Sequence, residues 1–406
     1  MLVRRRWRQQ FAAVAALLLA IFATTAASAR EVSIGESFVL KSAILHEDRR
    51  YEVALPASYA WAEDRRYPVL FVLDGADHFA HSAASVAYLA DKGDIPEMIV
   101  VAIDSTVRVR DFTQTDWSSH WIGGGGAAKF REFLANEMLP TIDRTYRTQP
   151  FRVLSGHSAG GQFVLWCLPS DRPLFQAYVA LSPSLDWDDG LPIRDLEKGL
   201  RSVPDLSGFV YVARSDDFGG ALADFEKLVA VLRSGAPAGL RVKSAALPLE
   251  SHTTIPLLGQ IDALRSLYEG WRLPEDLVDQ GVDATRDYFA ALSKKLGIAV
   301  PLPESALNDL GYAALGREQF AQAIALFEEN VRANPGSANA RDSAADGYLA
   351  AGDLPAAKAS ADRAVELAKR FRLSNLAAFE RTAQRVAERM RAAEAGTAAP
   401  AGDAKP

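Results

Sequence analysis

The sequence predicts an α/β domain with a mostly parallel central sheet, followed by a small all-α region. Two observations support this prediction. Between about residues 30 and 270, short continuous apolar runs alternate with helical patterns, as expected for strands buried on both faces of a parallel sheet. From about residue 304 onward the apolar runs disappear, and alanine-rich amphipathic patterns take over. The chain of 406 residues is long enough for two such parts.

The expected elements of the first part follow from these patterns in order. Strands are predicted over the apolar runs 69–73, 99–103, 152–155, 178–181 and 209–213, with a further strand-like run at 240–247. Helices are predicted over 79–92, 127–146, 159–168, 221–235 and 257–270. The α/β domain is therefore assigned to residues 30–275, followed by a helix and linker over 276–303. Two prolines near the end of this linker, in Val300-Pro301-Leu302-Pro303, favour extended backbone.

The second part, residues 304–394, carries a weak internal repeat. Gly311-Tyr312 recurs as Gly347-Tyr348, and Ala323 of the first copy aligns with Ala357 of the second. This spacing, with small residues at the helix crossing, resembles the period of tetratricopeptide repeats, although a generic helical hairpin gives a similar pattern. We expect the region either to pack on the α/β domain or to be capped by a helix over about 371–394, and to be a possible surface for a protein partner. Residues 395–406 read as a disordered low-complexity tail.

The N-terminal segment 1–29 reads as a signal peptide. Arginines at 4–8 are followed by an apolar core over 11–23 and by the small residues Ala27-Ser28-Ala29. The alternative is an uncleaved anchor helix, but thirteen apolar residues fall short of the ~20 that span a bilayer. We therefore expect a periplasmic or secreted protein with no membrane span after cleavage.

Charge and cysteine content exclude several functions. The net charge is -6, and it becomes -10 without the four basic residues of the first 29 positions, so nucleic acid is not an expected partner. Cys167 is the single cysteine and lies in an apolar run, where a buried core residue is expected. No spacing of histidine, cysteine or carboxylate residues suits a metal, and no glycine loop suits a nucleotide, so no cofactor is expected.

The expected chemistry lies at Ser158. Gly156-His157-Ser158-Ala159-Gly160 follows a predicted strand and precedes a predicted helix. This is the setting of the G-x-S-x-G nucleophile elbow, in which a strained serine on a tight turn presents its hydroxyl above the sheet edge. The helix that starts at the serine favours a developing anion.

A serine nucleophile needs a histidine base and an acid that orients it. In α/β-hydrolases these residues follow the serine in the order acid, histidine. Five of the six histidines precede Ser158, so chain order selects His252, in a loop between a strand-like run and a helix. His157 is expected to shape the elbow and His78 to line the cleft.

The oxyanion hole requires two backbone N–H donors. One should be the amide of Ala159, which directly follows the nucleophile. The second should come from the loop after the strand 69–73, where Gly75 would let the chain turn so that the amide of Ala76 faces the cleft. The alternative for Asp74-Gly75 is a plain turn between strand and helix.

With these residues in view, positions 38–270 resemble the esterase family of α/β-hydrolases that includes the enterochelin esterases, esterase D and feruloyl esterases. The stretches that carry the resemblance are LFVLDGADHF, RVRDFTQT, FREFLANEMLPTIDRTYRT, RVLSGHSAGG, LSPSLDW and LESHTTIP, and the C-terminal region resembles the repeat extension of one bacterial branch. The resemblance implies an α/β-hydrolase fold and carboxylic-ester hydrolysis by Ser158, with oxyanion donors at Ala159 and Ala76. Arg108, Arg110 and Asp111 match a family stretch and read as partners in loop salt bridges.

The acid is expected after the strand 209–213, because that sheet edge faces the nucleophile. Asp216 and Asp217 are adjacent there. Family members commonly place the acid three residues after a glycine, and here Ala213-Arg214 stands instead. Aligning Arg214 with that glycine selects Asp217 and aligning Ala213 selects Asp216. Phe218 resembles the aromatic residue that often follows the acid, which favours Asp217.

Together these features predict an exported serine esterase that acts on a small-molecule ester, with the triad Ser158, His252 and Asp217. The ester could be a siderophore or another medium-sized compound. Two alternatives stay open: an acyltransferase of the same fold, in which an acceptor other than water attacks the acyl-enzyme, and a non-enzymatic interaction protein that uses the helical repeats.

Overall fold

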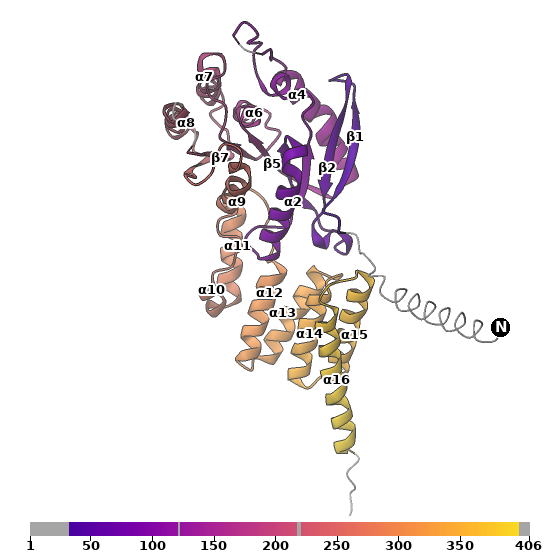
Figure 1. Ribbon diagram of the computed structural model, residues 1–406. Coiled ribbons are helices and arrows are strands. Elements are labelled where there is room, and N and C mark those ends of the chain that lie inside the picture. The colour runs from indigo at the N-terminus through magenta and orange to yellow at the C-terminus, as the bar shows by residue number, and fades with distance from the viewer. Residues whose placement is uncertain (1–31, 121, 217–220, 398–406) are drawn as a thin grey trace, which may run out of the picture. The chain divides into compact units, whose positions relative to one another are not determined.

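The computed structural model describes residues 32–120, 122–216 and 221–397 (Figure 1). The chain divides into two units, of which the second begins at Gly35 and contains the elements that follow. The predicted signal peptide, 1–29, lies outside the described residues. None of the helices in the described part of the chain is long and apolar enough to cross a membrane.

A single eight-stranded sheet lies at the centre of the second unit. Its strands follow the order β1-β2-β4-β3-β5-β6-β7-β8. Only the pairs β1–β2 and β2–β4 are antiparallel, so the prediction of an α/β-hydrolase with a mostly parallel sheet is confirmed. The strands are β1 (Glu36–Ser42), β2 (Glu47–Ala54), β3 (Tyr67–Leu73), β4 (Ile99–Ile103), β5 (Thr148–His157), β6 (Ala177–Leu181), β7 (Gly208–Arg214) and β8 (Leu240–Ala246).

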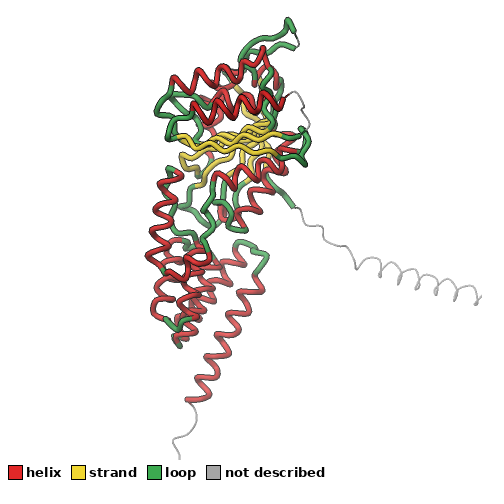
Figure 2. Tube along the Cα trace, turned by 90° about the vertical axis from the view of Figure 1, so that its left-hand side faces the viewer, coloured by secondary structure: helices red, strands yellow, loops and turns green. Residues whose placement is uncertain are grey.

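Helices cover both faces of this sheet, as the edge-on view in Figure 2 shows. Alternate residues of one strand enter two separate apolar clusters: Val69 and Phe71 of β3 enter one, and Leu70 enters the other. This explains why the strand is apolar throughout. The first cluster includes residues of α3 (Arg108–Phe112), α4 (Ala127–Phe133), α5 (Leu139–Thr145), α6 (Ala159–Cys167), α7 (Trp187–Ser202) and α8 (Ala221–Gly235). The second includes residues of α2 (Gly75–Asp91), α9 (Ile255–Leu267) and α11 (Val282–Leu296).

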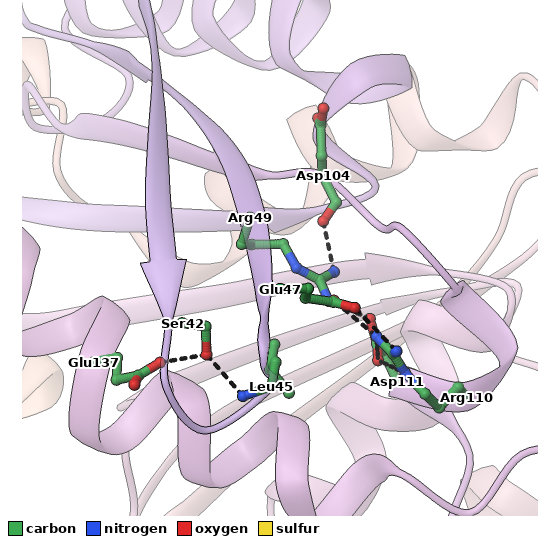
Figure 3. A network of polar contacts seen from close by, with 8 residues as sticks. All are labelled: Ser42, Leu45, Glu47, Arg49, Asp104, Arg110, Asp111 and Glu137. Carbon is green, nitrogen blue, oxygen red and sulfur yellow. Dashed lines mark hydrogen bonds and ion pairs between the residues drawn. The ribbon is translucent and has the colours of Figure 1, made fainter.

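A buried charge cluster ties the β1–β2 hairpin to α3 (Figure 3). The side chain of Arg49, in β2, is fully buried; it forms ion pairs with Asp111, at 2.8 Å, and with Glu47. Arg110 contacts Asp111 at 2.7 Å and Glu47 at 2.8 Å. A buried charge is tolerated only when it is paired in this way. Arg110 and Asp111 therefore fix helix α3, which begins at Arg108, as expected for salt-bridge residues.

Between the sheet and the C-terminal helices, where one helix was predicted over 276–303, the structure has a short helix and a longer one. They are α10 (Glu275–Gln280) and α11, followed by an extended stretch. Leu296, Val300 and Ala306 belong to the second apolar cluster, so this connection packs on the α/β core.

The C-terminal region is entirely helical over its described residues. It contains α12 (Glu304–Gly316), α13 (Phe320–Ala333), α14 (Ala338–Ala351), α15 (Leu354–Arg370) and α16 (Leu376–Thr397). The first helices of the two hairpins begin at 304 and 338, and the second helices begin at 320 and 354, so the two hairpins repeat with the same spacing as Ala323 and Ala357. Phe327 of α13 packs where Gly311 and Gly347 leave room, which accounts for the repeated glycines. Helix α16 continues into the start of the predicted tail, and the rest of the tail lies outside the described residues.

Candidate active site

Ser158 occupies a strained turn between β5 and α6. Its backbone angles are φ 57° and ψ -119°, a conformation that non-glycine residues avoid. The amide of Ser158 donates to the carbonyl of Leu181 at 3.0 Å, and its carbonyl accepts from the amide of Gln162 at 3.0 Å. A Cβ at Gly156 would lie 2.4 Å from the carbonyl oxygen of Gly160, so only glycine allows strand and helix to meet this closely. The predicted elbow geometry is present.

The loop between β8 and α9 brings His252 to this elbow. The ring of His252 lies against that of His157, with centroids 4.6 Å apart and planes tilted by 50°. Reciprocal hydrogen bonds close the loop around His252: the amide of Ser251 donates to Thr254 Oγ1 at 2.9 Å, and the amide of Thr254 donates to Ser251 Oγ at 3.2 Å. The imidazole is therefore held in a short closed loop next to His157, the residue that precedes Ser158.

Ser158, Ala159 and His252 line one cavity of about 570 Å³. Apolar and aromatic side chains form much of its wall: Val109, Trp117, Leu185, Trp187, Leu222 and Phe225. The start of α8, from Ala221 to Phe225, supplies one side of this wall. Charged side chains also reach the cavity: Arg108, Asp186, Arg214 and Asp224. A cavity of this size and character suits a small organic ligand.

The predicted oxyanion donors lie on two neighbouring helix starts. Ala159 is the first residue of α6 and lines the cavity, whereas Ala76 in the first turn of α2 is exposed and is not among the residues that line it. The residue that turns the chain is Asp74, with φ 56° and ψ 53°, and not Gly75 as expected from sequence. The two helix starts are close, because a Cβ at Gly160 would lie 3.4 Å from Asp74 Oδ2.

Arg108 bridges these two helix starts. Its Nε and Nη2 donate to the two carboxylate oxygens of Asp74 at 3.1 Å each, and Nη2 also donates to the carbonyl of His157 at 3.3 Å. A bidentate pair of this kind fixes both position and orientation. Arg108 thus forms the expected loop salt bridge and also lines the cavity. The sequence does not reveal that it joins the two loops, since both of its partners are distant from it along the chain.

The loop after β7, where the triad acid is expected, is described as far as Asp216. The carboxylate of Asp216 is 62 % exposed and lies 3.5 Å from Arg214, and its amide donates to the carbonyl of Glu250 at 3.3 Å. The loop after β7 therefore contacts the loop that carries His252. Asp217, the acid predicted from sequence, lies outside the described residues.

A row of histidines extends from the site. The ring of His157 faces His78, with centroids 5.8 Å apart, and Nδ1 of His78 lies 3.2 Å from Nε2 of His81. Burial, together with the nearby His252 and His78 rings, lowers the pKa of His157 to about 3. Burial likewise lowers the pKa of His81 to about 4. These two rings are therefore neutral at neutral pH.

The low pKa of His157 makes the stability of the fold depend on pH. The unfolded chain, with a histidine pKa of 6.5, binds a proton below that pH while folded His157 does not, so stability is lost as pH falls. Replacing His157 by Phe removes this contribution to the pH dependence of stability. From pH 7.5 to pH 5, the free energy of unfolding measured with urea should fall by about 2 kcal/mol more in wild type than in the variant. Replacing the exposed His46 by Asn is the control; equal losses in wild type and His157→Phe would contradict the prediction.

Two further side chains bear on the sequence predictions, one in the core and one in the cavity. Cys167 is buried, and burial raises the pKa of its thiol, which fits the expected core role. Ser184, which sequence reasoning did not single out, lines the cavity with its Oγ 3.3 Å from that of Ser158. The available signal was the Ser-Pro-Ser sequence directly after a buried strand.

Comparison with known proteins identifies relatives of the α/β part. Residues 42–205 match the family model described as "Putative esterase". The ferri-bacillibactin esterase BesA of Bacillus subtilis is 31% identical over 163 residues, which are 35% of this chain and 56% of BesA. A siderophore triacetylfusarinine C esterase of Aspergillus fumigatus is 28% identical over 138 residues, 30% of this chain and 45% of the relative. The chain thus spans about half the length of these curated relatives.

Solved structures extend the similarity. An IroE-like serine hydrolase from Shewanella oneidensis is 29% identical, with a TM-score of 0.63 over 73% of this chain and 99% of the other. The BES protein from Bacillus cereus, at 22% identity and a TM-score of 0.53, shares the fold over 59% of this chain and 98% of its own. The matched region contains the elbow at Ser158 and the loop of Asp74. Residues 42–205 are therefore similar to this esterase family, and the α/β part of the chain has an α/β-hydrolase fold.

Proposed function

We propose that this protein is an exported serine esterase that hydrolyses a carboxylic ester through an acyl-enzyme on Ser158. The observation that carries the proposal is that the strained Ser158, at the start of α6, shares one cavity with His252. A hydroxyl at a strained elbow, an imidazole in the loop between β8 and α9 and a helix start beneath the hydroxyl are parts that acyl transfer requires.

The reaction divides into two halves. In the first, His252 accepts the proton of Ser158 as its Oγ attacks the ester carbonyl, and the amide of Ala159, which lines the cavity, stabilises the oxyanion. The amide of Ala76, in the first turn of the neighbouring helix α2, is the second donor expected from sequence. His252 then donates its proton to the leaving alcohol, and an ester forms on Ser158. In the second half, His252 takes a proton from water as the water attacks the acyl-enzyme carbonyl. The bond to Ser158 then breaks, His252 returns the proton to Ser158 Oγ, and the carboxylic acid product is released. Asp217 orients the imidazole and stabilises its charged form.

The substrate we propose is a siderophore or another medium-sized ester. The names of the Bacillus subtilis and Aspergillus fumigatus relatives support an ester-containing siderophore. The cavity volume of about 570 Å³ lies within the range of small-molecule sites. The apolar core that follows the arginines at 4–8 supports export.

The test is an activity screen with a covalent probe. The purified protein is assayed against p-nitrophenyl esters of graded acyl length and against a ferric siderophore with ester bonds, and free acid is quantified. An activated p-nitrophenyl phosphonate is then added, and the modified peptide is identified by mass spectrometry. We expect turnover of at least one ester and a stoichiometric adduct on Ser158. Absence of both turnover and adduct would contradict the proposal.

A further inference from the structure

A strained turn follows β6 beside the nucleophile. Ser182 has φ 38°, in the region that residues with a side chain rarely adopt. Its amide donates to the carbonyl of Ala213 at 2.8 Å, and its Oγ accepts from the amide of Ser215 at 3.1 Å. The end of β7 therefore holds this turn in place. Strain maintained in this way is concentrated at functional sites.

The other end of the same turn is fixed to Ser158. The amide of Ser184 donates to the carbonyl of Ser158 at 3.0 Å. Pro183 packs on the first turn of α6, where a Cβ at Gly161 would lie 3.1 Å from its Cα. The backbone of Ser184 is thus positioned relative to the nucleophile from both sides.

The side chain of Ser184 reaches the reacting atom. Its Oγ lies 3.3 Å from the Oγ of Ser158, and both residues line the cavity. This distance is longer than the usual 2.7–2.8 Å of a hydroxyl pair, and catalytic hydrogen bonds are often long before substrate binds. The neighbouring hydroxyls of Ser182 and Ser215 contact each other, at 3.1 Å. Of these three serines, Ser184 is the one whose hydroxyl contacts the nucleophile.

The direction of this hydrogen bond follows from the reaction. Ser158 has one hydroxyl proton, which passes to His252, so toward Ser184 its oxygen can only accept. Negative charge develops on that oxygen twice: when the proton leaves as the new C–O bond forms, and when this bond breaks during deacylation before His252 returns a proton. A donor already oriented at such an oxygen stabilises both transition states.

We propose that Ser184 is a further catalytic residue, which donates a hydrogen bond to the Oγ of Ser158 in both halves of the reaction. This role rests on the proposed function, because it requires Ser158 to be the nucleophile. No proton is transferred by Ser184; it keeps its own proton throughout, and His252 remains the base.

The experiment compares Ser184→Ala with Ser184→Thr, which retains the hydroxyl. Stopped-flow measurement with a p-nitrophenyl ester separates acylation, seen as the burst, from deacylation, seen as the steady state. For Ser184→Ala we expect both rates to fall by roughly 10- to 100-fold, with less than a threefold change in KM. Ser184→Thr should recover most of the loss. Thermal unfolding establishes that both variants are folded.

The phosphonate probe supplies a second readout that depends on the nucleophile and not on the ester. Its rate of reaction with Ser158 should fall in Ser184→Ala by a factor similar to that of acylation. Wild-type rates in both assays, or a rise in KM alone, would overturn the role of Ser184. If the wild-type enzyme turned over esters but the phosphonate modified a residue other than Ser158, the proposed nucleophile would be wrong instead.

Discussion

Ser158→Ala should lower ester turnover by roughly 10³-fold or more, because the covalent route through the acyl-enzyme is lost. The oxyanion donors and the cavity remain, so slow hydrolysis by water and unchanged substrate binding are expected. The measurement is kcat and KM on the best ester of the screen. A matched control is Ser234→Ala, which removes an exposed hydroxyl that bonds within α8. Residual turnover within tenfold of wild type would place the chemistry elsewhere.

Asp217→Asn should also lower ester turnover strongly, by up to ~10⁴-fold. Without the carboxylate, His252 loses its orientation and its protonated form is no longer stabilised. Asp216→Asn is the matched control, because the carboxylate of Asp216 is exposed and pairs with Arg214. We expect this control to change turnover only slightly.

The pair of variants discriminates between the two adjacent aspartates. Near-normal turnover by Asp217→Asn would contradict the assignment, and a large loss in Asp216→Asn would transfer the role to that residue. Thermal unfolding of both proteins shows whether a loss of turnover reflects a loss of fold.

Strands buried on both faces were predictable, and the edge hairpin was not. Every residue of β4 is buried, so its sequence is a continuous apolar run. Strand β2 instead contains the charged residues Glu47, Arg49 and Arg50, which obscure a strand pattern. Arg49 is nevertheless buried, because Asp111, far away along the chain, neutralises it. A pairing over such a distance leaves no local signal.

Helix α7 illustrates a different difficulty. Its first residues, Asp188 to Gly190, have positive φ, and Pro192 lies inside it. Both features are typical of loops, so local sequence gives no indication of the helix that follows.

The site divides in the same way. The elbow is a contiguous motif, and chain order alone selects His252, so both follow from sequence. Ser184 comes from a different loop than Ser158, and its importance appears only when the distance between the two hydroxyls is known. Spacing alone does not decide which of the two adjacent aspartates, Asp216 or Asp217, is the triad acid. Nor does the sequence show that Asp74, and not the neighbouring Gly75, adopts the left-handed backbone conformation.

The start of α8 forms one wall of the cavity, although the proposed nucleophile and base come from other elements. Leu222 in this wall is 39% exposed, so its replacement disturbs little of the core. Phe225, in contrast, also packs into the first apolar cluster. Under the proposed function, mutational drift at Leu222 can therefore change which esters enter while Ser158 and His252 stay as they are. Because position 222 affects the cavity wall with little effect on the core, it is the natural first site of a saturation library in directed evolution. Position 225 is better varied in a background that has first been stabilised.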